Sequence, residues 1–102
     1  MRRALDALKD LARVELEKGA EEVHVLRVGQ RTILTRGRLP DLLVRGGTLP
    51  YLVCAVRREE LRVYLCDEEG RIGFGDNLRG EEMLRFMKRV GSCRRLFSLR
   101  KG

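Results

Sequence analysis

Three short β-rich segments in the second half of the chain constrain its fold more than any other feature. The segments are residues 50–57, 61–66 and 71–75. Charged turns separate them, and the second turn ends in Gly70, which can supply the left-handed residue that a tight hairpin needs. Short strands joined in this way pair with their neighbours in opposite directions. We therefore predict an antiparallel meander over residues 50–75.

Apolar residues at helical spacing flank this region on both sides. Residues 2–18 and 77–90 each carry one apolar stripe, with charged residues on the remaining faces and a glycine directly after or near the end. Asp76 or Asn77 can cap the second helix. The stripes consist of Leu5, Leu8, Leu11, Ala12 and Leu16 in the first helix, and of Met83, Phe86, Met87 and Val90 in the second.

The remaining segments complete one small domain of 102 residues. Residues 22–28 and 31–36 are predicted to form a first hairpin, and Pro40 can open a helical turn in the connector that follows. The basic, partly apolar tail over residues 92–102 is expected to be an edge strand or a docked arm. We predict a single α+β domain with a largely antiparallel sheet of about five strands and a helix near each end of the chain. Both helices are expected on one face of the sheet, which leaves the other face open.

Charge is distributed unevenly along the chain. There are 22 Lys+Arg and 15 Asp+Glu, which gives a net charge of +7. All 15 acidic residues precede Arg85, so the whole excess of positive charge lies in the last 18 residues. Such a patch attracts phosphates or other anionic partners, although a solvated tail would show the same pattern. The basic residues of this stretch are Arg85, Lys88, Arg89, Arg94, Arg95, Arg100 and Lys101.

The composition also bears on the environment of the protein. Arginine greatly outnumbers lysine, and Asn and Gln occur once each, a pattern that favours a thermophile but also follows from high genomic GC content. The three cysteines, Cys54, Cys66 and Cys93, are odd in number and are interpreted as small, mostly buried apolar residues. We see no signal peptide and no membrane-spanning run, so a cytoplasmic location without membrane partners is expected.

Alternation along the meander separates its side chains into two faces. If Arg57 pairs with Arg62, one face is apolar and belongs to the core, whereas the other interleaves arginine and tyrosine with small residues. Tyr51 and Tyr64 could then stack on bases, and the arginines could neutralise phosphates. An ordinary solvated sheet face would have a similar composition.

The predicted function is therefore sequence-tolerant binding of nucleic acid, most of all single-stranded DNA or RNA, through this sheet face and the basic C-terminus. Arg57, Arg62 and Arg71 are expected to contact phosphates or bases, and the C-terminal cations are expected to add long-range attraction. The predicted contact residues are Tyr51, Arg57, Arg62, Tyr64, Arg71, Arg94, Arg95, Arg100 and Lys101, with Arg36 and Arg38 as weaker candidates.

Enzymatic chemistry is not predicted. The only histidine, His24, lies within a predicted strand, and one histidine with three scattered cysteines is a poor zinc-ligand set. The glycines at positions 70, 73 and 75 do not form a phosphate-binding loop, because no Lys-Ser/Thr follows them. We therefore expect no catalytic residue, no metal, no cofactor and no small-molecule substrate.

The main alternative is a dimeric protein-interaction or adaptor module without nucleic-acid function. Leu96, Phe97 and Leu99 make the tail apolar enough to dock on the same chain or on a second copy. The element order of helix, hairpin, connector, meander and helix resembles profilin-like and roadblock-type domains in outline, which implies protein association. It also resembles the small ThermoDBP-type proteins that bind single-stranded DNA. No motif aligns residue by residue, so neither resemblance assigns a site.

Overall fold

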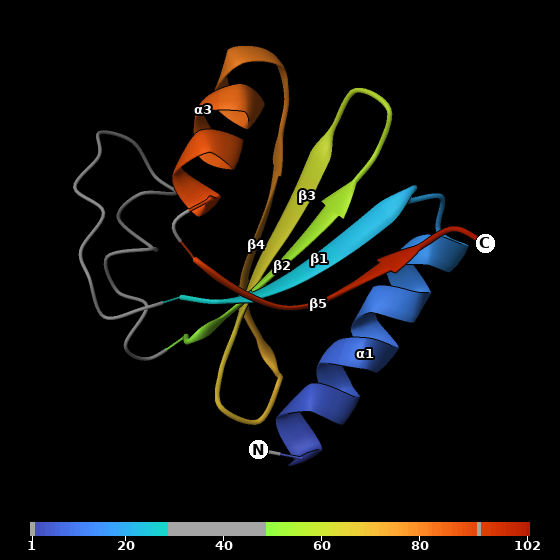
Figure 1. The fold of residues 1–102 in the computed structure, drawn as a ribbon, viewed down its shortest axis with the longest axis vertical. Coiled ribbons are helices and arrows are strands. Elements are labelled where there is room, and N and C mark those ends of the chain that lie inside the picture. Colours follow the sequence, from blue (N-terminus) through green and yellow to red (C-terminus); the bar gives the residue numbers. More distant parts are fainter. Residues whose placement is uncertain (1, 29–48, 92) are drawn as a thin grey trace.

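The computed structural model describes residues 2–28, 49–91 and 93–102 and confirms an α+β domain with an antiparallel sheet (Figure 1). The N-terminal helix and the C-terminal helix lie where the apolar stripes predict them. The elements are α1 (Arg2–Glu17), β1 (Glu22–Arg27), β2 (Tyr51–Val56), β3 (Leu61–Cys66), β4 (Ile72–Leu78), α3 (Gly80–Val90) and β5 (Arg94–Arg100).

The strands follow the order β4-β3-β2-β1-β5, and each neighbouring pair is antiparallel. The predicted meander therefore forms as β2, β3 and β4. The fifth described strand is the C-terminal tail, which pairs with β1 and so docks within its own chain. The two neighbours of β1 are β2 and β5. The sequence predicts instead a hairpin between residues 22–28 and 31–36. The second strand of that hairpin and the predicted helical turn at Pro40 lie outside the described residues.

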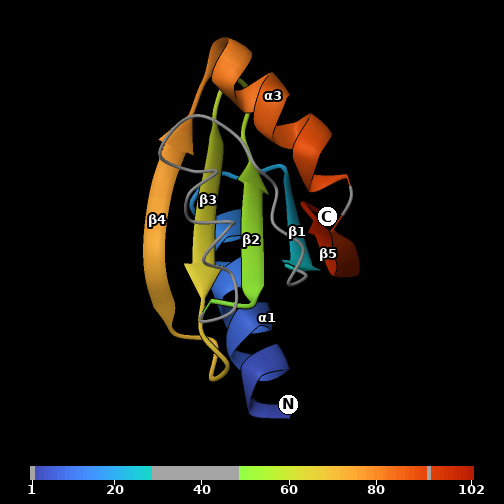
Figure 2. The same ribbon diagram turned by 90° about the vertical axis from the view of Figure 1, so that its left-hand side faces the viewer.

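The two helices lie on opposite faces of the sheet, so the prediction of one open face is wrong (Figure 2). The physical reason is that β1, β2 and β3 carry apolar side chains on both of their faces, and each face needs a cover. One core is formed under α3 by Leu26, Val28, Leu52, Cys54, Leu61, Val63, Leu65, Leu78, Phe86 and Val90. The other is formed under α1 by Ala4, Leu8, Ala12, Ala20, Val23, Val25, Tyr51, Val53, Ala55 and Cys66.

The pairing of β2 with β3 preserves the predicted faces although its register differs by two residues. Arg62 pairs with Ala55, and Arg57 lies in the turn, where its N–H donates to the Glu60 carbonyl at 2.8 Å. Because side chains alternate with a period of two, a shift of two residues leaves them on the same face. Ile72 departs from the prediction, since an irregularity in the β3–β4 pairing moves it out of the core and leaves it 52% exposed.

The boundary between β4 and α3 also differs from the sequence prediction. Asp76 and Asn77 continue β4 instead of capping the helix, because Leu78 pairs with Leu61 and is buried in the core. The helix begins at Gly80, whose φ of +58° turns the chain out of the strand. Neither described helix is long and apolar enough to cross a membrane.

Candidate nucleic-acid interface

The sheet face that carries the predicted tyrosines and arginines lies beneath α1. Tyr51 is only 2% exposed, and its ring belongs to the same core as Leu8 and Val53. Arg27 covers it further, because its Nη1 donates to the Tyr51 hydroxyl at 3.2 Å and its guanidinium carbon lies 5.3 Å from the ring centroid. A base needs a free aromatic face on which to stack. The structure therefore places Tyr51 in the core rather than on an open binding surface.

A buried carboxylate on α1 holds Tyr64 and Arg62. The Glu15 side chain is 1% exposed; it accepts a hydrogen bond from the Tyr64 hydroxyl at 3.2 Å and lies 3.5 Å from Nη1 of Arg62. Arg62 also donates from Nε to Oδ1 of Asn77 at 3.1 Å. Burial, and after it the charge of Glu15, raises the pKa of Tyr64, which keeps the phenol protonated as a donor. These two predicted contact residues thus fasten α1 to the sheet.

Arg57 and Arg71 are also engaged within the chain. Arg57 donates from Nη1 to the Lys18 carbonyl at 3.0 Å, just beyond the C-terminal end of α1. Arg71 pairs with Asp67 and Glu69, at 3.1 Å in each case, inside the turn between β3 and β4. The backbone hydrogen bond from Arg71 lowers the pKa of Asp67 and so keeps this carboxylate charged. A phosphate would compete with these acceptors for either arginine.

The glycines of β4 make room for side chains of this chain. A Cβ atom at Gly73 would lie 2.5 Å from a methyl carbon of Leu49, and one at Gly75 would lie 3.0 Å from the Tyr64 ring. The close approach that small residues allow is therefore already used by Leu49 and Tyr64.

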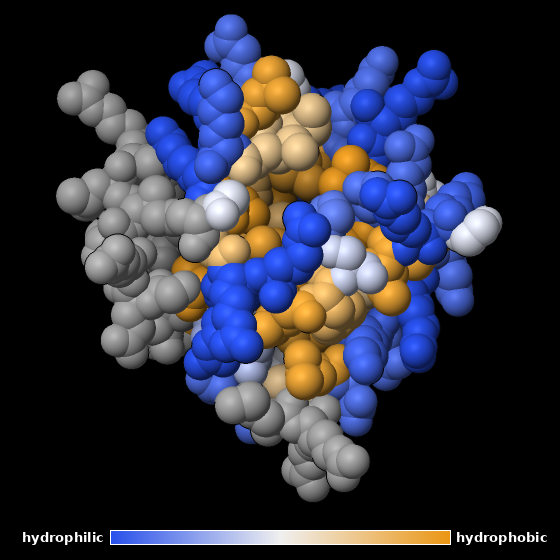
Figure 3. Space-filling view, viewed as in Figure 1, coloured by the Kyte–Doolittle hydropathy of each residue, from blue (hydrophilic) through white to orange (hydrophobic). Residues whose placement is uncertain are grey.

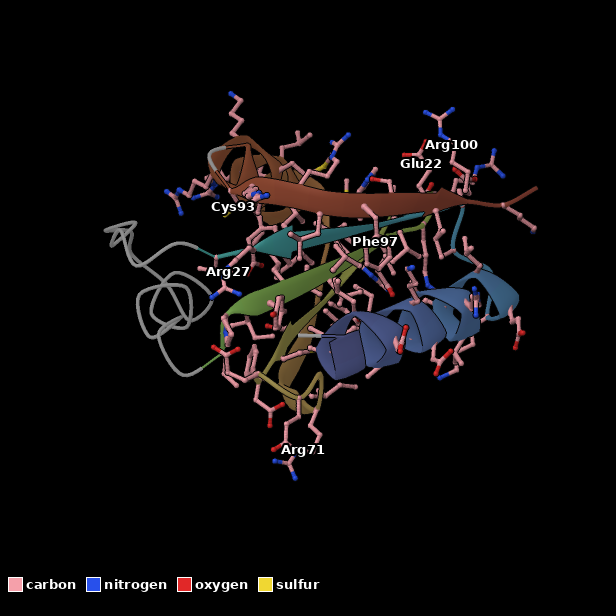
Figure 4. All side chains as sticks on the ribbon, turned by 60° about the horizontal axis from the view of Figure 1, so that its bottom comes forward. Glu22, Arg27, Arg71, Cys93, Phe97 and Arg100 are labelled. Carbon is pink, nitrogen blue, oxygen red and sulfur yellow. The ribbon has the colours of Figure 1, made fainter. Side chains whose placement is uncertain are left out.

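The C-terminal cations are arranged along β5, at the edge of the sheet. Arg95 lies opposite Leu26 and so on the α3 side, whereas Arg94 lies opposite Arg27 on the α1 side. Arg100 reaches Glu22 on β1, with 3.0 Å between Nε and Oε1, and the two side chains lie side by side in Figure 4. Phe97 points towards α1 in the same view. The strand therefore presents cations on both sides of its edge.

Most of these cations have no acidic partner among the residues that the structure describes. Lys88, Arg94, Arg95 and Lys101 are exposed and form no ion pair with any described residue. Many other arginines of the described segments are paired with carboxylates, as Arg71 is. We define the cationic edge as Arg94, Arg95, Arg100 and Lys101 of the C-terminal strand and tail, together with Lys88 in the last turn of α3.

The cationic edge brings together only part of the predicted set. Arg71 lies at the opposite end of the molecule from Arg100 (Figure 4), and Arg36 and Arg38 lie outside the described residues. Lys88 was not among the predicted contacts, although its place on the charged face of α3, in the last turn, is a signal that the sequence contains. The C-terminal cations of the prediction thus lie on and directly after one edge strand, and the meander arginines do not join them.

The side chains that could support catalysis or metal binding are dispersed. His24 uses both ring nitrogens within the chain: Nδ1 lies 2.7 Å from the Ser98 hydroxyl and Nε2 lies 3.2 Å from Glu22. Cys54, Cys66 and Cys93 form no disulfide among the described residues, and burial raises the pKa of Cys54 to about 12 and that of Cys66 to about 11. In the segments for which side chains are placed, no three His, Cys, Asp or Glu residues gather into a metal-binding group.

Comparison with known proteins adds no relative. No protein-family profile, curated protein or solved structure matches the chain. Function is therefore inferred from the charge and geometry of the described residues.

Proposed function

We propose that this protein binds nucleic acid through the phosphate backbone, without reading sequence, along the cationic edge. The observation that supports this proposal is the group of exposed cations on β5 and α3 without described acidic partners. A guanidinium that is not neutralised within its own protein loses no internal ion pair when a phosphate binds. Arg94 and Arg95 are proposed as the central contacts, because adjacent positions on a strand place them on either side of the edge.

A single strand is the proposed target. Consecutive phosphates of a flexible strand can follow β5, whose seven residues extend over roughly 23 Å at about 3.3 Å per residue. Arg100 can take part after exchanging Glu22 for a phosphate, and Lys101 continues the edge beyond the strand. Tyr51 and Tyr64 have no part in this proposal, since both serve the contact with α1. A cytoplasmic location remains a prediction.

Fluorescence anisotropy with a labelled oligonucleotide of about 20 nucleotides tests the proposal. Each phosphate contact with a single strand contributes about −0.7 to the slope of the logarithm of the binding constant against the logarithm of the salt concentration, so four contacts predict a slope of roughly −3. The double variant Arg94→Gln/Arg95→Gln should reduce that slope by about one to two units. The matched control is Arg13→Gln/Arg71→Gln, which removes the same charge from two exposed but ion-paired arginines.

The control decides whether binding is local or follows from net charge alone. Local binding requires the control to bind far more tightly than the β5 variant. If the two double variants lose affinity equally, the oligonucleotide senses only the net charge, and the cationic edge is not a site.

A second candidate function is dimerisation through β5. It is favoured by one observation: β5 is an end strand of the sheet, and its Leu96, Phe97 and Leu99 are only partly buried. Because β5 pairs with β1 along its length, deleting the tail would remove a strand of the sheet, and point variants are the better probe. Light scattering coupled to gel filtration tests this alternative, which requires twice the chain mass of 11.8 kDa at micromolar concentration.

A further inference from the structure

A cavity lies between α3 and the sheet, on the side facing away from α1. Its volume is about 450 Å³, within the range of about 300–1,000 Å³ that is usual for sites of small ligands. Figure 3, viewed from the β5 side, shows an apolar hollow beside α3 with hydrophilic side chains around it. The cavity is lined by His24, Leu26, Cys54, Val56, Leu61, Phe86, Met87, Val90, Gly91, Cys93 and Arg95.

The wall of this cavity is mainly apolar and comes from rigid elements. Leu26, Cys54 and Leu61 are buried residues of the sheet, and Phe86 and Val90 are the two buried residues of α3. Burying an apolar group against such a wall contributes about 25 cal/mol per Å² removed from water. At roughly 30 Å³ for each water-sized group, the cavity volume suits a ligand of about ten to fifteen non-hydrogen atoms.

The polar rim of the cavity is positively charged. Arg95 lines it and forms no ion pair with any described residue, so its guanidinium is available to an anion. His24 also lines it, but both of its ring nitrogens are within hydrogen-bonding distance of Ser98 or Glu22. Among the described residues, the site therefore combines one cation that forms no ion pair with an apolar interior, and its described lining offers few hydrogen-bonding groups for a polar molecule such as a nucleobase.

We infer that this cavity binds a small amphipathic anion, with an apolar body of about ten carbons under α3 and a carboxylate or similar group on Arg95. The inference does not rest on nucleic-acid binding. The carboxylate would form charge-assisted hydrogen bonds with the guanidinium, which suits paired oxygen acceptors. Met87, which is 48% exposed at the rim, can close over the apolar part of the ligand because its side chain adapts to irregular shapes.

Displacement of the fluorescent anion 1-anilinonaphthalene-8-sulfonate by decanoate, decanol or decylamine tests this inference on the intact protein. Decanoate should displace the probe with a saturable, micromolar-range dissociation constant, and decylamine should bind at least about tenfold more weakly. Arg95→Gln should weaken decanoate about tenfold, as expected for loss of a hydrogen bond to a charged group. Arg94→Gln is the matched control, since it removes the same charge from the other face of β5 and should change affinity less than about twofold.

Two further measurements do not depend on the Arg95 variant. Val56→Phe should fill part of the cavity and abolish displacement, with circular dichroism confirming that the variant is folded. Decanoate should also slow alkylation of Cys93 in the unaltered protein, because this partly buried thiol lines the same cavity. If Val56→Phe does not fold, the protection of Cys93 from alkylation by decanoate still tests whether the cavity binds this ligand.

The inference is overturned if decanoate and decylamine bind alike, if Arg94→Gln and Arg95→Gln have equal effects, or if decanoate leaves the alkylation rate of Cys93 unchanged. These outcomes are distinct from failure of the proposed function. Arg94→Gln should weaken oligonucleotide binding and spare decanoate, so each proposal can fail while the other stands.

Discussion

Replacing Glu15 by glutamine tests whether the arginine and tyrosine side of the sheet is a structural interface with α1. The substitution keeps the size of the side chain and removes its charge. At a separation of about 4 Å and an effective dielectric constant of about 20, each pair of opposite charges attracts by about 4 kcal/mol. Glu15 lies 3.5 Å from Arg62 and 4.0 Å from Arg57, and its Oε2 accepts no hydrogen bond from a described residue.

The net effect is smaller than the attraction, because removing the charge also removes the desolvation cost of burying it. Breaking a buried ion pair from one side typically costs about 3–5 kcal/mol. Here the side chains of Arg57 and Arg62 are 22% and 28% exposed, so water can solvate them after the change. We therefore expect Glu15→Gln to lower the free energy of unfolding by about 2–3 kcal/mol.

Urea denaturation followed by circular dichroism at 222 nm measures this effect, and Glu17→Gln on the exposed side of α1 is the control. The control should stay within about 0.5 kcal/mol of the parent. A double-mutant cycle that combines Glu15→Gln with Tyr64→Phe should show a coupling energy of about 0.5–1.5 kcal/mol, since Tyr64→Phe removes the hydroxyl that donates to Glu15. Equal stability of the two glutamine variants would refute the reasoning, as would a loss of oligonucleotide affinity in Tyr64→Phe.

Three further predictions concern turns, thiols and pH. Gly70→Ala should lower the free energy of unfolding by about 1–3 kcal/mol in urea melts, because its φ is +82° and the new Cβ would lie 2.7 Å from a side-chain atom of α1. Gly80→Ala, with φ +58° and nothing within 4 Å of the added Cβ, should cost less. With a thiol reagent at pH 8, Cys93 should react first and Cys54 and Cys66 only after unfolding, because both are buried and have raised pKa values. The pKa of Cys54 rises from 9.0 to about 12 on folding, so the native state keeps the thiol proton to a higher pH than the unfolded state does. The free energy of unfolding should therefore be constant below pH 9 and fall between pH 9 and pH 12, and it should fall less steeply in Cys54→Ala.

The sequence predicts most of the described secondary structure because its periodic signals are local. Alternation in the meander and the stripe of α3 specify which side chains share a face, and a register error of two residues does not alter those faces. Long-range pairing is different, since a local pattern does not specify a strand's neighbour. The strand at 22–27 pairs with the C-terminal tail, 67 or more residues away, and nothing within either segment names the other as its partner.

The candidate site could be predicted only in its C-terminal half, and one residue of α1 explains why. The excess of positive charge after Leu84 predicts exposed cations, of which several have no acidic partner among the described residues, whereas the role of Arg57 and Arg62 depends on what covers their face. Interleaved arginine, tyrosine and small residues fit both a nucleic-acid surface and a face opposed by a buried carboxylate.

Glu15 distinguishes these two readings, because it follows Leu8 and Ala12 by seven and three residues and so continues the buried stripe of α1. A carboxylate in that position requires cations or donors on the opposing element, since an unpaired buried charge is costly. The only described cations that reach it are Arg62 on β3, Arg57 in the turn between β2 and β3, and Lys18 just after α1. An acidic residue on an apolar helical stripe therefore predicts a covered, basic sheet face, and in this chain it leaves β5, rather than the meander, as the surface on which nucleic-acid binding is proposed.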